Sequence, residues 1–323
     1  MLKLIRLIVS MLFFAPTANA QVLDPSWVYG KAIQKVFTRT THSKGRSIAS
    51  FSEDGLTVRV QDGWKLVGNK PDAAIKNRTL LLPGFLGTDY VFQAMLRDPE
   101  MEKKGYQLIA GNAPGFAGQK VPENFSFSIE AYAALVEKMA EKEKIDTLVG
   151  HSYMATVLGE VAHRGKFHGK ILMISPALES DDEPLSTRAL DLLTRADPAT
   201  RDLAWIGMYQ FMEESFSGFF NSGDSKHIDE AAAEARKTPM HEAQFMLVQY
   251  FNYLRSDSYS IHNLEHSTAE IHYLNGGQDI VQLKPENKKL LEASGVKFHH
   301  LKNASHMVMI DEPKKINALL RSF

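Results

Sequence analysis

The residue types that activate a hydroxyl nucleophile occur together in the second half of the chain, as Ser152, Asp279 and His306. A serine hydroxyl is a weak nucleophile until a base removes its proton, and a histidine base needs an acid to orient it. Ser152 lies in "LVGHSYMATVLG" (148–159), where an apolar strand pattern passes into a helix-compatible sequence. This pattern predicts a strand–turn–helix elbow that exposes the serine hydroxyl. A serine that only caps the following helix is the alternative.

Asp279 and His306 are expected to complete this site from the C-terminal part of the chain. The stretch "YLNGGQDIVQ" places Asp279 in a turn directly after a predicted core strand. The stretch "NASHMVMIDEP" places His306 between a short strand and a terminal helix. In one large group of triads the residues follow in this order along the chain, Ser, Asp, His. Asp181 or Glu179, after the preceding strand, remains the alternative acid.

One position of the elbow departs from the pattern G-x-S-x-G. Gly150 supplies the first glycine, but Met154 replaces the second. Small residues are expected on both sides because the strand and the helix approach closely there. Two interpretations stay open. A wider spacing, or a side chain turned toward the pocket, accommodates Met154 in an active enzyme, or Met154 marks a chain with altered or lost activity.

The elements that would position these residues alternate between apolar strands and amphipathic helices. A hairpin of alternating strands is predicted for 47–63, a short helix for 24–37, and a longer helix for 128–144. Buried strands are predicted where apolar runs end in turns; they lie at 78–85, 107–116, 146–152, 170–177 and 271–276. This alternation predicts an α/β domain with a mostly parallel central sheet.

A long interval breaks the alternation. More than ninety residues separate Ala177 from Ile271, which is too long for a loop, and they carry helical patterns without a convincing strand. We therefore expect residues 178–268 to form a helical cap, inserted into a core made of 21–177 and 269–323.

The expected cap is rich in large apolar side chains. They are Trp205, Met208, Tyr209, Phe211, Met212, Phe216, Phe219, Phe220, Phe245, Met246, Tyr250, Phe251 and Tyr253. Packing against the core accounts for most of them. The surplus favours a lid over an apolar pocket, to which flexible methionines can adapt. A small-molecule ester, thioester or lactone with an apolar acyl or alcohol part is the substrate that this composition favours.

The N-terminus predicts an export signal over residues 1–20. Lys3 and Arg6 precede the apolar run "LIVSMLFFA", and "ANA" precedes Gln21. A charged start, a short apolar run and a small-x-small site are typical of a cleaved signal peptide. The run is about half the ~20 residues that span a membrane. We expect cleavage near Ala20, no stable membrane insertion afterwards, and a periplasmic or secreted product; an uncleaved anchor is the alternative.

Composition excludes several classes of partner and cofactor. The chain has 37 basic and 38 acidic residues, a balance that argues against nucleic-acid binding. It has no cysteine, which excludes disulfides, thiol nucleophiles and thiolate metal sites. His299 and His300 are neighbours on a predicted strand and therefore point to opposite faces. We expect neither a metal nor an organic cofactor.

From about residue 50 onward the chain resembles the α/β-hydrolase family of serine hydrolases, including members that carry a helical cap. The resemblance implies that Ser152 is the nucleophile, Asp279 the acid and His306 the base. The stretch "PGFLGT" (83–88) resembles the family's HGxxG loop, which implies an oxyanion hole formed by the backbone N–H groups of Phe85 and Tyr153.

Two further positions depart from the family pattern. Pro83 replaces the histidine of the HGxxG loop, and Asn112 replaces the aspartate of the DxPGxG turn. Both support loops, so the backbone donors should remain. The expected activity is hydrolysis of a carboxylic ester through an acyl-enzyme. The alternatives are amide, lactone or carbon–carbon bond hydrolysis, acyl transfer, perhydrolysis, or ligand binding without catalysis.

Overall fold

The computed structural model describes residues 49–53, 55–221, 223–256, 264, 267–281 and 283–323. These residues belong to one compact unit, Ala49–Phe323. The predicted export signal and the predicted helix at 24–37 lie outside the described residues, so both remain predictions.

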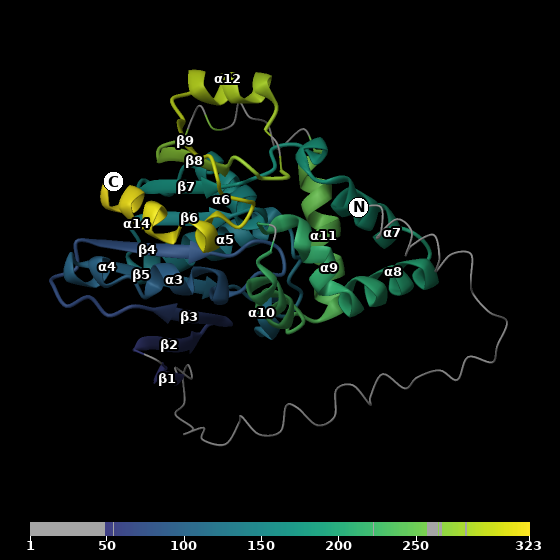
Figure 1. The fold of residues 1–323 in the computed structure, drawn as a ribbon, viewed down its shortest axis with the longest axis horizontal. Coiled ribbons are helices and arrows are strands. Elements are labelled where there is room, and N and C mark those ends of the chain that lie inside the picture. Colours follow the sequence, from purple (N-terminus) through teal and green to yellow (C-terminus); the bar gives the residue numbers. More distant parts are fainter. Residues whose placement is uncertain (1–48, 54, 222, 257–263, 265–266, 282) are drawn as a thin grey trace. The chain divides into compact units, whose positions relative to one another are not determined.

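A nine-stranded sheet forms the centre of this unit (Figure 1). Its order is β1-β2-β3-β5-β4-β6-β7-β8-β9. The strands are β1 (Ala49–Glu53), β2 (Leu56–Gln61), β3 (Trp64–Gly68), β4 (Asn77–Leu82), β5 (Tyr106–Asn112), β6 (Thr147–His151), β7 (Lys170–Ile174), β8 (Glu270–Gly276) and β9 (Lys297–Leu301). The pairs β1–β2, β2–β3 and β3–β5 are antiparallel, and the other five pairs are parallel. The predicted mostly parallel sheet is confirmed.

Apolar layers cover both faces of the sheet because successive strand residues point to opposite sides. In β4, Leu80 and Leu82 belong to one buried cluster and Leu81 belongs to the other. The first cluster includes residues of α5 (Ile129–Glu143), α6 (Tyr153–His163) and α12 (Pro285–Ala293). The second includes residues of η1 (Asp89–Phe92), α3 (Gln93–Leu96), α4 (Pro99–Lys103), α13 (Val308–Asp311) and α14 (Pro313–Arg321).

Between β7 and β8 the described residues form helices and no strand. They are η3 (Ser180–Asp182), α7 (Leu185–Thr194), α8 (Pro198–Gln210), α9 (Met212–Phe216), η4 (Ser217–Phe219), α10 (Ser225–Ala235) and α11 (Met240–Leu254). Ion pairs connect the ends of two of these helices. The buried carboxylate of Asp191 in α7 pairs with Arg195, directly after α7, at 2.8 Å and with Arg255, directly after α11, at 2.7 Å. The division of the chain into a core and a separate cap remains a prediction.

Candidate active site

Ser152 stands at the turn from β6 into α6, with a backbone φ of 50° and ψ of −117°. Positive φ is uncommon for a residue with a side chain, and such strain persists only where the surroundings enforce it. The neighbouring strand and the following helix do so here. The Ser152 N–H donates to the Ile174 carbonyl of β7 at 2.8 Å, and the Ser152 carbonyl accepts from the Ala155 N–H of α6 at 2.8 Å. Ser152 as a whole residue is partly exposed. The elbow predicted from the sequence is therefore present.

Glycine is required at two positions around this elbow. A Cβ atom on Gly150 would lie 2.6 Å from the Met154 carbonyl oxygen, so the strand and the helix touch there through their backbones. A Cβ atom on Gly84 would lie 3.0 Å from the Cβ atom of Ser152 and 2.8 Å from Nδ1 of His151. The loop at 83–88 therefore packs directly on the elbow.

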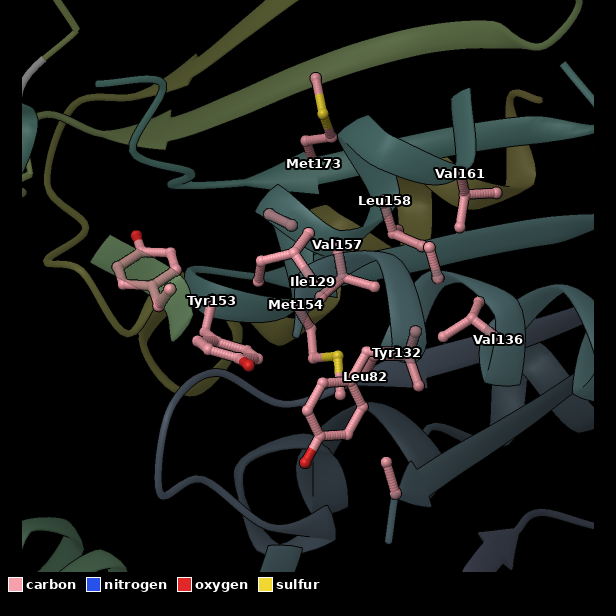
Figure 2. Packing of buried hydrophobic residues seen from close by; sticks show 14 of the residues in the cluster. Leu82, Ile129, Tyr132, Val136, Tyr153, Met154, Val157, Leu158, Val161 and Met173 are labelled. Carbon is pink, nitrogen blue, oxygen red and sulfur yellow. The ribbon is translucent and has the colours of Figure 1, made fainter. Parts of the chain in front are cut away.

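The structure explains why methionine is tolerated at position 154. It is the carbonyl group of Met154 that faces Gly150, whereas the Met154 side chain is fully buried in the cluster that contains Leu82, Ile129 and Tyr132 (Figure 2). The strand–helix approach thus requires a small residue on the strand side only. The thioether fills the core beneath the elbow.

Asp279 and His306 come together from two separate loops. Asp279 follows β8, and His306 lies between β9 and α13; Oδ1 of Asp279 is 2.8 Å from Nδ1 of His306. Each residue is only 3% exposed. The loops approach closely because Gly276 and Gly277 have no side chain, and a Cβ atom on either would lie within 2.3 Å of a backbone carbonyl oxygen.

The environment of this pair favours a negative carboxylate and a positive imidazole. Burial alone raises the pKa of Asp279, but the charge of His306 and the hydrogen bonds from His306 and from the Val281 N–H outweigh it and hold the pKa below its usual value. Burial alone lowers the pKa of His306, but Asp279 and, through its charge, Glu183 outweigh it and hold the pKa above its usual value. Each member of the pair therefore stabilises the ionised form of the other.

The two alternative acids are engaged elsewhere. Asp181 is exposed and pairs with Arg188 at 3.2 Å. Glu179 accepts hydrogen bonds from Lys284 at 2.5 Å and from Asn287 at 2.8 Å. Within the described chain, the carboxylate bonded to His306 is that of Asp279.

His151 connects the elbow to the His306 loop, a role that the sequence did not indicate. Its ring centroid is 4.6 Å from that of His306, and its Nε2 lies 3.1 Å from the His306 carbonyl oxygen. Burial and the neighbouring His306 lower the pKa of His151 to about 3, so its ring is neutral. Among the described residues, the Ser152 hydroxyl has no direct hydrogen bond to His306; such contacts are often long before substrate binds.

The predicted oxyanion donors lie on the two segments that meet at the elbow. Tyr153 is the first residue of α6, where the backbone N–H has no partner within the helix and the helix dipole favours negative charge. Phe85 lies in the loop that packs on Ser152, and its ring centroid is 6.2 Å from that of Tyr153. The position of both segments is compatible with the predicted role, which remains a prediction.

Asn112 supports the loop that contains Phe85. Its side-chain oxygen accepts from the Asp89 N–H at 2.7 Å, and its side-chain nitrogen donates to Oδ1 of Asp89 at 2.7 Å. Lys65 pairs with the same carboxylate at 2.9 Å. An aspartate at position 112 could not donate in this way, because it would place a second carboxylate against Asp89.

Aromatic rings from the helices between β7 and β8 contact residues around the elbow. The centroid of Trp205 is 6.4 Å from that of Phe85, the centroid of Tyr250 is 5.2 Å from that of Tyr153, and the centroid of Phe219 is 5.2 Å from that of His306. Of the thirteen large apolar side chains named for the expected cap, seven are buried: Trp205, Met212, Phe220, Met246, Tyr250, Phe251 and Tyr253. Phe245, by contrast, is 55% exposed.

Two structural features are absent from the described residues. Their His, Asp and Glu side chains form no group of three or more that is placed to hold a metal ion. None of their helices is long and apolar enough to span a bilayer.

Comparisons with known proteins identify the family and the fold. Residues 79–319 match the model described as the alpha/beta hydrolase family. The structure is similar to a hydrolase from Oleispira antarctica, with a TM-score of 0.62 and 20% identity, over 80% of this chain and 93% of that one. It is also similar to a structure from work on carboxylesterases of Nitrososphaera gargenis, with a TM-score of 0.61 and 16% identity, over 85% and 97% of the two chains.

A third similar structure is a thermophilic esterase from Thermogutta terrifontis, with a TM-score of 0.62 and 15% identity, over 86% of this chain and 97% of that one. At these identities the likeness establishes the fold. No curated protein sequence matches the chain. The fold that the resemblance implied is confirmed.

Proposed function

Because the chain belongs to the alpha/beta hydrolase family, we propose that it is a serine hydrolase that cleaves carboxylic esters through Ser152, His306 and Asp279. The observation that carries this proposal is the buried hydrogen bond between Asp279 and His306 next to a strained serine elbow. The esterases among the similar structures support it further.

The reaction would begin with attack of the Ser152 hydroxyl oxygen on the acyl carbon, while His306 accepts the hydroxyl proton. Asp279, bonded to Nδ1, holds the imidazole so that Nε2 is the base, and it stabilises the positive ring. The backbone N–H groups of Phe85 and Tyr153 would bind the oxyanion, each contributing about 2.7–4 kcal/mol.

The cycle would then pass through an acyl-enzyme. Proton transfer from His306 to the leaving alkoxide releases the alcohol and leaves the acyl group on Ser152. A water molecule, deprotonated by His306, attacks this ester, and the returned proton restores the serine as the acid leaves.

The rings of Phe85, Trp205 and Tyr250 favour a substrate with an apolar acyl or alcohol part. The export signal predicted at residues 1–20 favours action in the periplasm or outside the cell. Sequencing the N-terminus of protein recovered from the periplasm and the medium tests that location, and cleavage near Ala20 is the expected result.

Labelling with a fluorophosphonate probe tests the mechanism directly. The probe should bond to Ser152 with loss of fluoride, and the label should be absent from Ser152→Ala. A panel of esters, amides and lactones of graded chain length then identifies the bond that is cleaved. A folded wild-type protein that resists the probe would contradict the serine mechanism and favour a binding role.

A further inference from the structure

A short segment from the helices between β7 and β8 lies against the loop that carries His306. It contains η4 (Ser217–Phe219) and the residues on either side of it. The ring centroid of Phe219 is 5.2 Å from that of His306. The side-chain nitrogen of Asn221 donates to the Asn303 carbonyl oxygen at 3.4 Å. The segment therefore borders the loop between β9 and α13 through both an apolar and a polar contact.

The same segment borders the loop that carries Asp279. Gly218 is exposed, and the atom nearest to a Cβ built on it would be Cδ1 of Ile280, at 3.9 Å. Ile280 directly follows Asp279 and is 37% exposed. Phe219 is half-buried and packs against the second apolar cluster. Two partly exposed apolar residues, Phe219 and Ile280, therefore lie beside the Asp279–His306 pair.

The chemistry of acyl transfer decides which part of an ester would lie beside His306. In the proposed mechanism the imidazolium donates its proton to the leaving alkoxide, so the leaving oxygen must lie within hydrogen-bond reach of His306. The carbonyl oxygen must point at the oxyanion donors, which are expected on Phe85 and Tyr153. The acyl chain takes the remaining direction from the acyl carbon. The alcohol part, which extends from the oxygen next to His306, is therefore the part within reach of Phe219.

The composition of the segment indicates what kind of alcohol fits there. Residues 215–221 read "SFSGFFN" and contain no charged side chain. Phe220 is buried in the second cluster, whereas the Phe219 ring contacts that of His306. An apolar ring next to the leaving oxygen favours alkyl and aryl groups, and it offers a charged alcohol no partner in exchange for its lost hydration.

We propose, on the basis of the proposed hydrolase function, that Phe219 is a specificity-determining residue that contacts the alcohol part of the ester and selects uncharged apolar alcohols. Its ring binds the alkyl or aryl group while His306 protonates the leaving oxygen. Once the alcohol has left, the acyl-enzyme is the same whichever alcohol was released. The contact between Phe219 and the alcohol therefore affects acylation and not hydrolysis of the acyl-enzyme.

Two series of esters test this assignment. One series combines an acetyl group with alcohols from methanol to hexanol, and the other combines methanol with acyl chains of the same lengths. kcat/KM is measured for the wild type, Phe219→Ala, Phe219→Leu and Phe245→Ala. Phe245→Ala is the matched control, because it removes the same ring from a 55% exposed position on α11, where the ring stacks on Phe127. Thermal unfolding establishes that each variant is folded.

In the wild type, kcat/KM should rise by up to about fourfold for each methylene of the alcohol that contacts the ring. Phe219→Ala should flatten this rise, so that its loss of kcat/KM grows from the methyl to the hexyl ester. Its dependence on acyl length should match that of the wild type. Phe219→Leu should restore part of the rise, and Phe245→Ala should keep the wild-type dependence on both parts.

A purely structural role of Phe219, such as support of His306, predicts a different result. It would lower kcat/KM by the same factor for every ester in both series. Such a uniform loss in folded Phe219→Ala, an equal change of slope in the two series, or a wild type whose kcat/KM does not rise with alcohol length would overturn the proposal.

Partitioning of the acyl-enzyme provides a second readout. Added alkanols compete with water for the acyl group, and by microscopic reversibility they approach through the position that the leaving alcohol occupied. The ratio of new ester to free acid should increase with alkanol length in the wild type, and Phe219→Ala should lose this increase. A ratio that does not depend on chain length, or that depends on it equally in both proteins, overturns the inference.

Fluorophosphonate labelling of the wild type tests the hydrolase mechanism separately. A folded protein that resists the probe contradicts the proposed function. A protein that labels at Ser152 and cleaves esters, but whose Phe219→Ala variant keeps the wild-type dependence on alcohol length, contradicts the role of Phe219 alone.

Discussion

Oδ1 of Asp279 lies 2.8 Å from Nδ1 of His306, and both side chains are almost completely buried. This contact joins the loop after β8 to the loop after β9. With Nδ1 occupied by the carboxylate, Nε2 is the nitrogen that would exchange protons with Ser152 and the substrate in the proposed mechanism. The first prediction concerns this contact.

Asp279→Asn should reduce kcat by about 10³–10⁴-fold, because an amide favours the wrong tautomer of His306 and does not stabilise the positive ring. Steady-state kinetics on a short-chain nitrophenyl ester measure the effect. Glu179→Gln is the control, since Glu179 bonds to Lys284 and Asn287, and it should keep near-wild-type kcat. Equal loss in the two variants would contradict the assignment of the acid.

The pH dependence should reflect the raised pKa of His306. The base must be neutral, so kcat/KM should rise with pH through a midpoint above the ordinary value of about 6.5. Stability should change in the opposite direction. A group whose pKa is raised by folding stabilises fully below its unfolded pKa, and this contribution is lost as the pH rises through the folded pKa.

Urea unfolding of the wild type and of His306→Gln, measured between pH 5 and pH 9, tests this linkage. The difference in unfolding free energy between them should be largest at the acidic end and should shrink as the pH rises. A difference that grows with pH would show that folding lowers the pKa of His306.

Restoring the usual glycine at the elbow should harm the protein. Met154→Gly removes a fully buried side chain and puts glycine in α6, so we expect a loss of about 3–5 kcal/mol of unfolding free energy without a gain in kcat. Met154→Leu, which conserves volume, should cost less than about 1.5 kcal/mol. Urea unfolding and ester kinetics measure both, and higher activity in Met154→Gly would show that methionine restrains the elbow.

Gly150→Ala should be destabilising by about 1–3 kcal/mol, because the added methyl group would lie 2.6 Å from the Met154 carbonyl oxygen. Labelling of Ser152 should slow as the elbow shifts. Gly218→Ala is a suitable control: its nearest neighbour would be the Cδ1 atom of Ile280, at 3.9 Å. Thermal unfolding compares them, and equal midpoints would argue that the strand and helix are more widely spaced.

Asn112→Asp would restore the usual family residue but should lower stability by about 1–3 kcal/mol at neutral pH. The new carboxylate would face Asp89 and lose the donated hydrogen bond. The cost should decrease below about pH 4, where carboxyl groups become protonated. Chemical unfolding at pH 7 and at pH 4 measures it. A cost that is the same at both values would exclude charge repulsion as the cause.

Local patterns in the sequence were sufficient to predict many of the strands and the turn that carries Ser152. The apolar runs at 78–85 and 170–177 end in turns, and they became β4 and β7 because a strand covered on both faces must be apolar throughout its length. The elbow around Ser152 was also recognisable, since a strand pattern, a nucleophile and a helix pattern follow each other directly. The order of the candidate triad required only the positions of the residues along the chain.

Contacts between distant segments were decided by the tertiary structure. The sequence offered three acids after core strands as partners for His306. The structure shows that Asp279 is the one that bonds to it, because Gly276 and Gly277 let the two loops approach closely. A helical register cannot show whether the backbone or the side chain of Met154 faces the strand. The pairing of Glu183 with Tyr250 joins residues 67 positions apart. The periodicity of a sequence indicates which residues are buried, but three-dimensional packing determines which buried residues contact one another.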